Sequence, residues 1–184
     1  MHSDMNKSFD LTFVTARLLL KPCTTEDADL VLALLNSALF IQFVGDRNVR
    51  DLEAAKQYIR ERMLPQMNRM GFGNYVIIRK SDSMKLGTCG LFDRPGLEGI
   101  DIGFGLLEPY HGKGYGYEAS VCIRNAAFEL FGIKLLRGVT VKENKASRGL
   151  LKKLGMHYVQ DVRLPGDTVD LMLYELSFET FKGI

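Results

Sequence analysis

The sequence predicts an α/β protein of the α+β type, with a mixed, mostly antiparallel central sheet of about seven strands flanked by about four helices. Strand-like and helical segments follow in the order strand, two helices, three strands, helix, strand, helix, two strands. Short turns separate the three consecutive strands, as between antiparallel neighbours. No repeat or linker-like tract occurs, so we expect one domain over residues 1–184, with a flexible N-terminus at 1–11.

The individual elements follow from hydrophobic spacing and from residues that start or stop helices. Strands are expected where apolar residues run together or alternate, and helices where they recur every three or four positions. Gly and Pro mark the ends. The expected elements are a strand at 18–20, a helix capped by Thr24 or Thr25, a helix from near Asp51 to Pro65 or Gly71, strands at 74–79, 85–92 and 99–107, a helix at 115–131, a strand at 135–141, a helix from Asn144 to Gly155, and strands at 158–162 and 169–176.

Composition narrows the classes of function. The formal net charge is only +2, which argues against a nucleic-acid partner recognised through overall charge. The most apolar stretch, 31–44, is too short and too polar to span a bilayer, so no membrane partner is expected. Cys23, Cys89 and Cys122 have no metal-ligand or disulfide spacing. We therefore expect no metal and a cytoplasmic location.

The segment from Asp101 to Tyr117 is the most informative part of the sequence, because a strand enters it and a helix leaves it. Gly112, Gly114 and Gly116 stand at alternate positions, where the backbone can approach a ligand closely. Successive amides and the positive end of the following helix favour a phosphate or pyrophosphate group.

Three designs of phosphate loop compete for this segment. A P-loop needs Ser or Thr after Gly-Lys, but Gly114 follows Lys113 here, so we reject it. A dinucleotide-binding fingerprint needs an acidic residue at the end of the next strand and an opening parallel unit. The first acid after that strand is Glu143, and the preceding strands look antiparallel, which makes this design a weak alternative. The third design is an acyl-CoA loop.

The residues of this segment resemble a known family. His111 to Gly116 is similar to the pyrophosphate-loop pattern Gln/Arg-x-x-Gly-x-Gly/Ala of the GNAT acetyltransferases, with His at the first position. The longer string Asp-Ile-Gly-Phe through Pro-Tyr-His-Gly-Lys-Gly-Tyr resembles the RimJ/RimL branch. Two flanking stretches agree with that branch, Thr15-Ala-Arg-Leu-Leu-Leu-Lys-Pro22 and Val141-x-x-Asn144-x-x-Ser147 through Lys153-Leu-Gly-Met156.

The resemblance implies a GNAT-like fold and an acetyl-CoA site in a V-shaped opening between two central strands. Phe104 and Leu106 would pair with the pantetheine arm, and Asn144 and Ser147 would lie near the arm and the thiol. The loop would hold the pyrophosphate. Its expected coenzyme-binding residues are His111, Gly112, Lys113, Gly114, Tyr115, Gly116 and Tyr117.

The reaction implied is direct attack of a neutral amine on the thioester. Asp101 is the favoured general base, directly or through water, because it matches the branch's glutamate and shares a strand face with two glycines. A purely structural role for Asp101 is equally open, and Glu108 is a second candidate. Many members use a tyrosine as the acid, but that position is Leu151 here, which leaves Ser147.

Two main classes of function remain open, and a nucleotide-dependent oxidoreductase is a third, weaker alternative. The first is an N-acetyltransferase acting on a primary amine, either a protein N-terminus or a small molecule. An α-amine is easier to deprotonate at neutral pH than a lysine side chain, by roughly 3 to 4 kcal/mol. The second is a non-catalytic acyl-CoA-binding module. Because many relatives form dimers, a homodimer is also considered.

Overall fold

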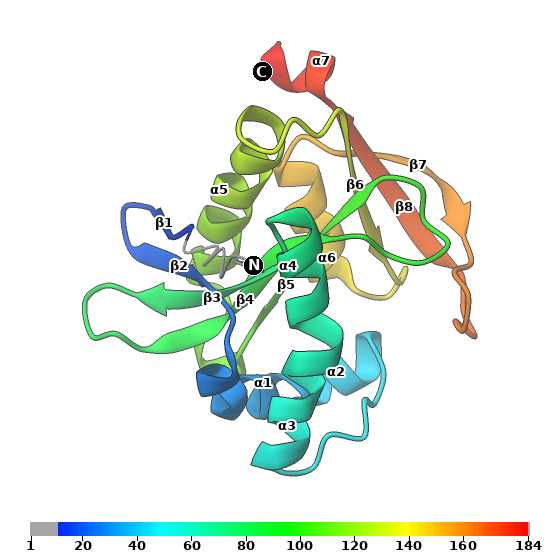
Figure 1. The fold of residues 1–184 in the computed structure, drawn as a ribbon. Coiled ribbons are helices and arrows are strands. Elements are labelled where there is room, and N and C mark those ends of the chain that lie inside the picture. The colour runs from blue at the N-terminus through cyan, green and yellow to red at the C-terminus, as the bar shows by residue number, and fades with distance from the viewer. Residues whose placement is uncertain (1–10, 184) are drawn as a thin grey trace, which may run out of the picture.

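The computed structural model describes residues 11–183, so the expected flexible N-terminus lies, except for Leu11, outside the described residues. One eight-stranded sheet has the order β1-β2-β3-β4-β5-β6-β8-β7 (Figure 1). Every neighbouring pair is antiparallel except β5 and β6, which are parallel. This confirms the predicted fold class. The strands are β1 Phe13–Val14, β2 Leu18–Pro22, β3 Asn74–Arg79, β4 Lys85–Phe92, β5 Ile100–Leu106, β6 Leu135–Thr140, β7 His157–Val162 and β8 Leu171–Ser177.

The sheet has one strand more than expected. The additional strand, β1, has only two residues, which is too short to show alternation in the sequence. It pairs with β2 across a tight turn, with Phe13 opposite Leu20.

The helices are also more numerous than expected, because two short helices were missed. The α-helices are α1 Ala28–Leu35, α2 Ala38–Phe43, α3 Leu52–Tyr58, α4 Leu64–Met70, α5 Tyr115–Glu129, α6 Lys145–Lys153 and α7 Phe178–Lys182. The missed helices are α2 and α7, each of which starts at a serine N-cap, Ser37 and Ser177. Within residues 11–183, no helix is long and apolar enough to cross a bilayer.

The second expected helix is continuous past Pro65 and ends at Gly71, where φ is +78°. A π-helical stretch, Ile59–Met63, joins α3 to α4. There the Leu64 N–H donates to the Ile59 carbonyl, five residues back. This wider turn accommodates Pro65, which has no N–H to donate, so the proline does not end the helix.

Two hydrophobic clusters cover the two faces of the sheet. The larger one joins the strands to α5 and α6 through residues such as Ile123 and Leu151. The second one joins α1 and α3 to β3 through Val31, Ala55 and Val76. In Figure 1, α1, α2 and α3 gather at the bottom of the view, and α5 lies higher up beside the strands.

The two central parallel strands separate soon after they begin. Ile100 pairs with Leu136 and Asp101 with Arg137, and no further pairing joins β5 to β6 among the described residues. From Ile102 onward, β5 pairs only with β4, while β6 pairs with β8 along its whole length. The sheet therefore opens between β5 and β6, on the side where both strands end.

Candidate functional site

Helix α5 begins at the opening without a side-chain cap. Its N-cap is Gly114, with φ +82°, whereas α3 and α6 are capped by the side chains of Asp51 and Asn144. The first helical hydrogen bond runs from the Glu118 N–H to the Gly114 carbonyl. The four N–H groups of residues 114–117 find no acceptor within the described residues. Such a group of amides, at the positive end of a helix, suits an anionic ligand.

Two glycines explain why the chain can form this loop. Gly112 and Gly114 both have positive φ, +70° and +82°, a conformation that other residues rarely adopt. Gly116 differs from them, because an added Cβ there would make ordinary van der Waals contact with Leu106 at 3.4 Å and Leu150 at 3.9 Å. The start of α5 thus packs closely against β5 and α6, and these three elements converge at Gly116.

The free edge of β5 presents the backbone of Phe104 and Leu106 to the opening. The Leu107 N–H donates to the Leu86 carbonyl on β4 at 2.9 Å. Because backbone groups alternate along a strand, the residues on either side of that position direct theirs away from β4. His111 lies over this edge, and its Nε2 donates to the Leu106 carbonyl at 2.7 Å. The structure therefore brings His111, Leu106 and the loop together.

Asp101 lies where β5 and β6 separate, and its side chain is only 1% exposed. Its Oδ2 accepts hydrogen bonds from Arg94 Nε at 2.9 Å and Nη2 at 2.6 Å. Its Oδ1 accepts from the Val139 N–H on β6 at 3.3 Å. Burial raises the pKa of Asp101 to about 6, although Arg94 and the Val139 amide favour the charged form. The carboxylate links the two strands at the base of the opening.

Asn144 and Ser147 come together at the start of α6. Asn144 Oδ1 accepts a hydrogen bond from the Ser147 N–H at 3.0 Å and so caps the helix. The hydroxyl of Ser147 makes no hydrogen bond within residues 11–183, which leaves it free to donate. Leu151, at the position where a tyrosine was considered, is buried against Gly138. Glu108 is exposed in the short 3-10 helix Glu108–Tyr110.

Sequence reasoning missed three residues that surround this site. Arg94 was not singled out, and its pairing with Asp101 becomes visible only when the loop before β5 folds back. Arg17, in the turn between β1 and β2, and Glu118 on α5 form an ion pair of 2.6 Å. Both residues lie in segments that resemble the family. The sequence signal for their pairing was the positive charge in one segment and the negative charge in the other.

Known proteins resemble this chain in sequence and in fold. Residues 17–157 match the family model described as an acetyltransferase (GNAT) domain. A curated relative, "Uncharacterized N-acetyltransferase YjdG" of Bacillus subtilis, is 28% identical over 106 residues, or 57% of this chain and 63% of that protein. The match to this relative thus spans less than two thirds of its length.

Solved structures show the same fold. An acetyltransferase from Agrobacterium tumefaciens superimposes with a TM-score of 0.77 at 22% identity, covering 96% of this chain and 99% of that one. A protein described as a putative ribosomal-protein-serine acetyltransferase from Vibrio cholerae has a TM-score of 0.73 at 19% identity, covering 91% and 98%. The family model covers well over half of the chain, from the end of the β1–β2 turn to the start of β7. The chain therefore belongs to the GNAT acetyltransferase family.

Proposed function

We propose that this chain is an N-acetyltransferase that moves an acetyl group from acetyl-CoA to a primary amine by direct attack. The observation that carries the proposal is the row of four N–H groups at 114–117 that find no acceptor among residues 11–183, at the start of a fifteen-residue helix. The pyrophosphate of coenzyme A would accept from these amides. Lys113 adds a positive charge to the same loop, and Gly112 allows its turn. Tyr115, Gly116 and Tyr117 complete the set of amide donors.

The free edge of β5 is the second part of the proposed coenzyme site, where the pantetheine arm would bind. Pantetheine carries two amide groups, which can pair with an extended strand as another strand would. The backbone groups of Phe104 and the N–H of Leu106 face the opening between β5 and β6 and are suited to this pairing, whereas the Leu106 carbonyl already accepts from His111. His111 would hold the end of this edge, and Asn144 Nδ2 would donate to the arm from the opposite side.

For the chemistry, we propose Asp101 as the general base and Ser147 as the proton donor to the departing thiolate. A pKa near 6 lets Asp101 be charged at neutral pH and still exchange protons with an amine. Since Asp101 is buried, its proton would arrive through water. The Ser147 hydroxyl, which has no hydrogen-bond partner in the described part of the chain, lies in the first turn of α6. Amides along the opening would polarise the thioester carbonyl.

We place the acceptor amine on the face of β5 that carries Asp101, Gly103 and Gly105. This face lies opposite α5 and is lined by Phe92 and Leu34, which approach Gly103 and Gly105. A protein N-terminus, as in the RimJ/RimL branch, and a small-molecule amine both fit a site of this kind. The resemblance in three ordered motifs favours that branch. The three free cysteines support a cytoplasmic enzyme.

The test is a thermal-shift comparison of acetyl-CoA with NAD, followed by thiol release in the presence of a panel of amines. A ligand in large excess over its Kd stabilises the folded state, so acetyl-CoA should raise Tm and NAD should not. Turnover with at least one α-amine or polyamine is then expected. Stabilisation by acetyl-CoA without thiol release from any amine would favour the binding module instead. Stabilisation by NAD alone would overturn the proposal.

A further inference from the structure

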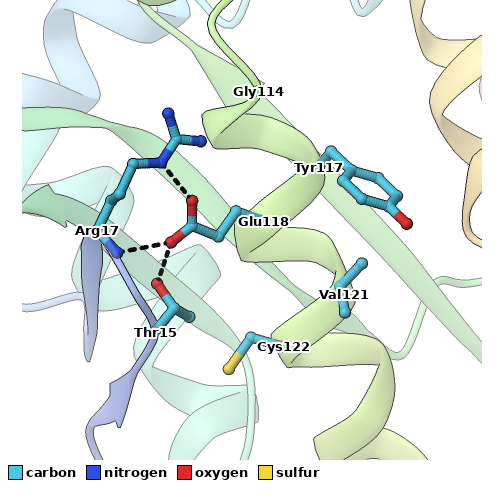
Figure 2. A pocket seen from close by; sticks show the side chains of 7 residues that line it. All are labelled: Thr15, Arg17, Gly114, Tyr117, Glu118, Val121 and Cys122. Carbon is cyan, nitrogen blue, oxygen red and sulfur yellow. Dashed lines mark hydrogen bonds and ion pairs between the residues drawn. The ribbon is translucent and has the colours of Figure 1, made fainter.

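Arg17, the last residue of the turn between β1 and β2, lies next to the loop at the start of α5. Its Nη1 donates to the Lys113 carbonyl at 3.0 Å, and its Nε donates to Glu118 Oε2 at 2.6 Å. One guanidinium group therefore holds both the last residues of the loop and the first turn of the helix. Figure 2 shows the Glu118 carboxylate between Arg17 and Thr15, in the shallow pocket that these residues line with α5.

The direction of these bonds determines where the loop amide points. In a trans peptide, the C=O of one residue and the N–H of the next point in opposite directions. Arg17 binds the Lys113 carbonyl, so the Gly114 N–H must point away from Arg17. That N–H is the first of the four without an acceptor in the described chain. Arg17 is thus on the far side of the peptide from any ligand of the loop.

We propose that Arg17 is a positioning residue for the coenzyme: it fixes the Lys113–Gly114 peptide so that the loop amides face the pyrophosphate. The inference rests on the proposed function, because it assigns a role toward the same acetyl-CoA site. In this arrangement Arg17 binds the carbonyl side of the Lys113–Gly114 peptide. The ligand contacts the N–H on the other side of the same peptide.

Arg17 is itself held in place from several directions. Glu118 Oε1 accepts from the Arg17 N–H at 2.8 Å and from the Thr15 hydroxyl at 2.6 Å. Burial alone would raise the pKa of Glu118, but the bonds from Thr15 and Arg17 outweigh it and keep the pKa below its usual value. The guanidinium also lies 4.4 Å from the centre of the Tyr115 ring. An arginine in these fixed contacts can hold a peptide in one orientation.

The experiment measures affinity by calorimetry for three ligands, which are CoA, dephospho-CoA and pantetheine. Arg17→Met removes the guanidinium donors but keeps an unbranched apolar side chain at this position. Arg69→Met is the matched control, because Arg69 is an exposed arginine whose ion-pair partner is the exposed Asp93, on a different carboxylate from the one that holds Arg17. We expect Arg17→Met to bind CoA and dephospho-CoA about tenfold more weakly and pantetheine equally well, because pantetheine lacks the pyrophosphate. The control should bind all three as the wild type does.

The ligand series separates the competing explanations. A loss confined to CoA would make Arg17 a direct ligand of the 3′-phosphate and overturn the positioning role. Equal losses for all three ligands would indicate general damage to the fold and also overturn it. Unchanged CoA affinity in Arg17→Met, with a wild type that binds CoA, would refute this inference alone. A wild type that does not bind CoA would refute the proposed function as well.

Arg17→Lys gives a second, milder variant that keeps the positive charge. A lysine has one nitrogen and cannot reach Lys113 and Glu118 in the planar arrangement of a guanidinium. We expect the same ligand pattern as in Arg17→Met, with a smaller loss. Wild-type affinity of Arg17→Lys for CoA would show that charge alone suffices, against the positioning role.

Discussion

Asp101 combines features of a structural and of a reactive group. Both of its oxygens are engaged, by Arg94 and by the Val139 amide, yet burial raises its pKa to about 6. If Asp101 is the base, activity requires its charged form. We therefore expect kcat/KM of the wild type to rise as pH increases through about 6, and Asp101→Asn to lose this dependence together with about a hundredfold in kcat. A pH–rate profile with a responsive amine measures both effects.

Asp29→Asn is the control for this change, since Asp29 pairs with Lys85 at the start of α1, away from the opening. This variant should keep the wild-type profile. Full activity of Asp101→Asn would assign Asp101 a structural role, linking β5 to β6. In that case CoA affinity and turnover would both persist, and the base would have to be sought elsewhere.

Two glycines that have different backbone conformations give a second prediction about single residues. Gly149 lies inside α6, and an added Cβ there meets nothing within 4 Å. Gly149→Ala should therefore stabilise the protein by about 0.5–1 kcal/mol. Gly114 has φ +82° and lies beside Arg17, so Gly114→Ala should destabilise by roughly 1 kcal/mol or more. Urea unfolding of both variants tests the contrast, and stabilisation by Gly114→Ala would contradict it.

The glycine loop could be predicted from sequence, whereas its supporting ion pairs could not. Gly112, Gly114 and Gly116 carry a local signal, because their spacing alone indicates a loop that approaches a ligand. The partners of Asp101 and Glu118 depend on tertiary contacts. Arg17 and Glu118 are 101 residues apart, and only the folded sheet brings β2 beside α5.

Among the elements, the close packing of α6 on β6 depends on Gly138. An added Cβ at this position would lie 2.6 Å from Leu151 Cδ2, and Leu151 is buried. Gly138→Ala should destabilise the protein by about 1–3 kcal/mol, because Leu151 would have to move or α6 would shift. Chemical unfolding measures this loss.

A double-mutant cycle with Leu151→Val locates the cause. If the two side chains collide, Leu151→Val should recover part of the loss caused by Gly138→Ala, with a coupling energy of at least about 0.5 kcal/mol. Additive effects would mean that the strain lies in the backbone of β6 instead. The same cycle tests whether Leu151 fixes the position of α6, and with it Ser147.

Most elements could be predicted because their apolar residues form a continuous or regularly spaced pattern in the sequence. Strands such as β3 and β4 were expected within the bounds observed, since their apolar runs are continuous and end in turn residues. Helix α2 was missed because none of its residues is buried, so its apolar residues do not follow a core-facing period. Pro65 left the end of the second helix open, because a π turn cannot be read from a short sequence pattern.

At the scale of the whole molecule, most perturbed carboxylates stabilise the fold at neutral pH. Hydrogen bonds and nearby cations outweigh desolvation and hold the pKa values of Asp27, Asp29 and Glu118 below their usual range. A lowered pKa in the folded state contributes stability above the unfolded pKa. That contribution is lost as pH falls through the folded pKa. Protonation of these carboxylates at low pH therefore removes stability and promotes unfolding in acid.

Asp101 should contribute to stability in the opposite direction. Its pKa rises from 3.8 to about 6 on folding, so between these values the folded state binds more protons than the unfolded state. Its contribution therefore falls as pH increases through this window, by roughly 3 kcal/mol in total. Asp101→Asn cannot titrate, so the difference in unfolding free energy, wild type minus variant, should decrease between about pH 4 and pH 7. Urea unfolding across this range gives that difference. An increase with pH would instead mean that the Arg94 pair outweighs burial and that the pKa of Asp101 is lowered in the fold, which would weaken its case as a base near neutral pH.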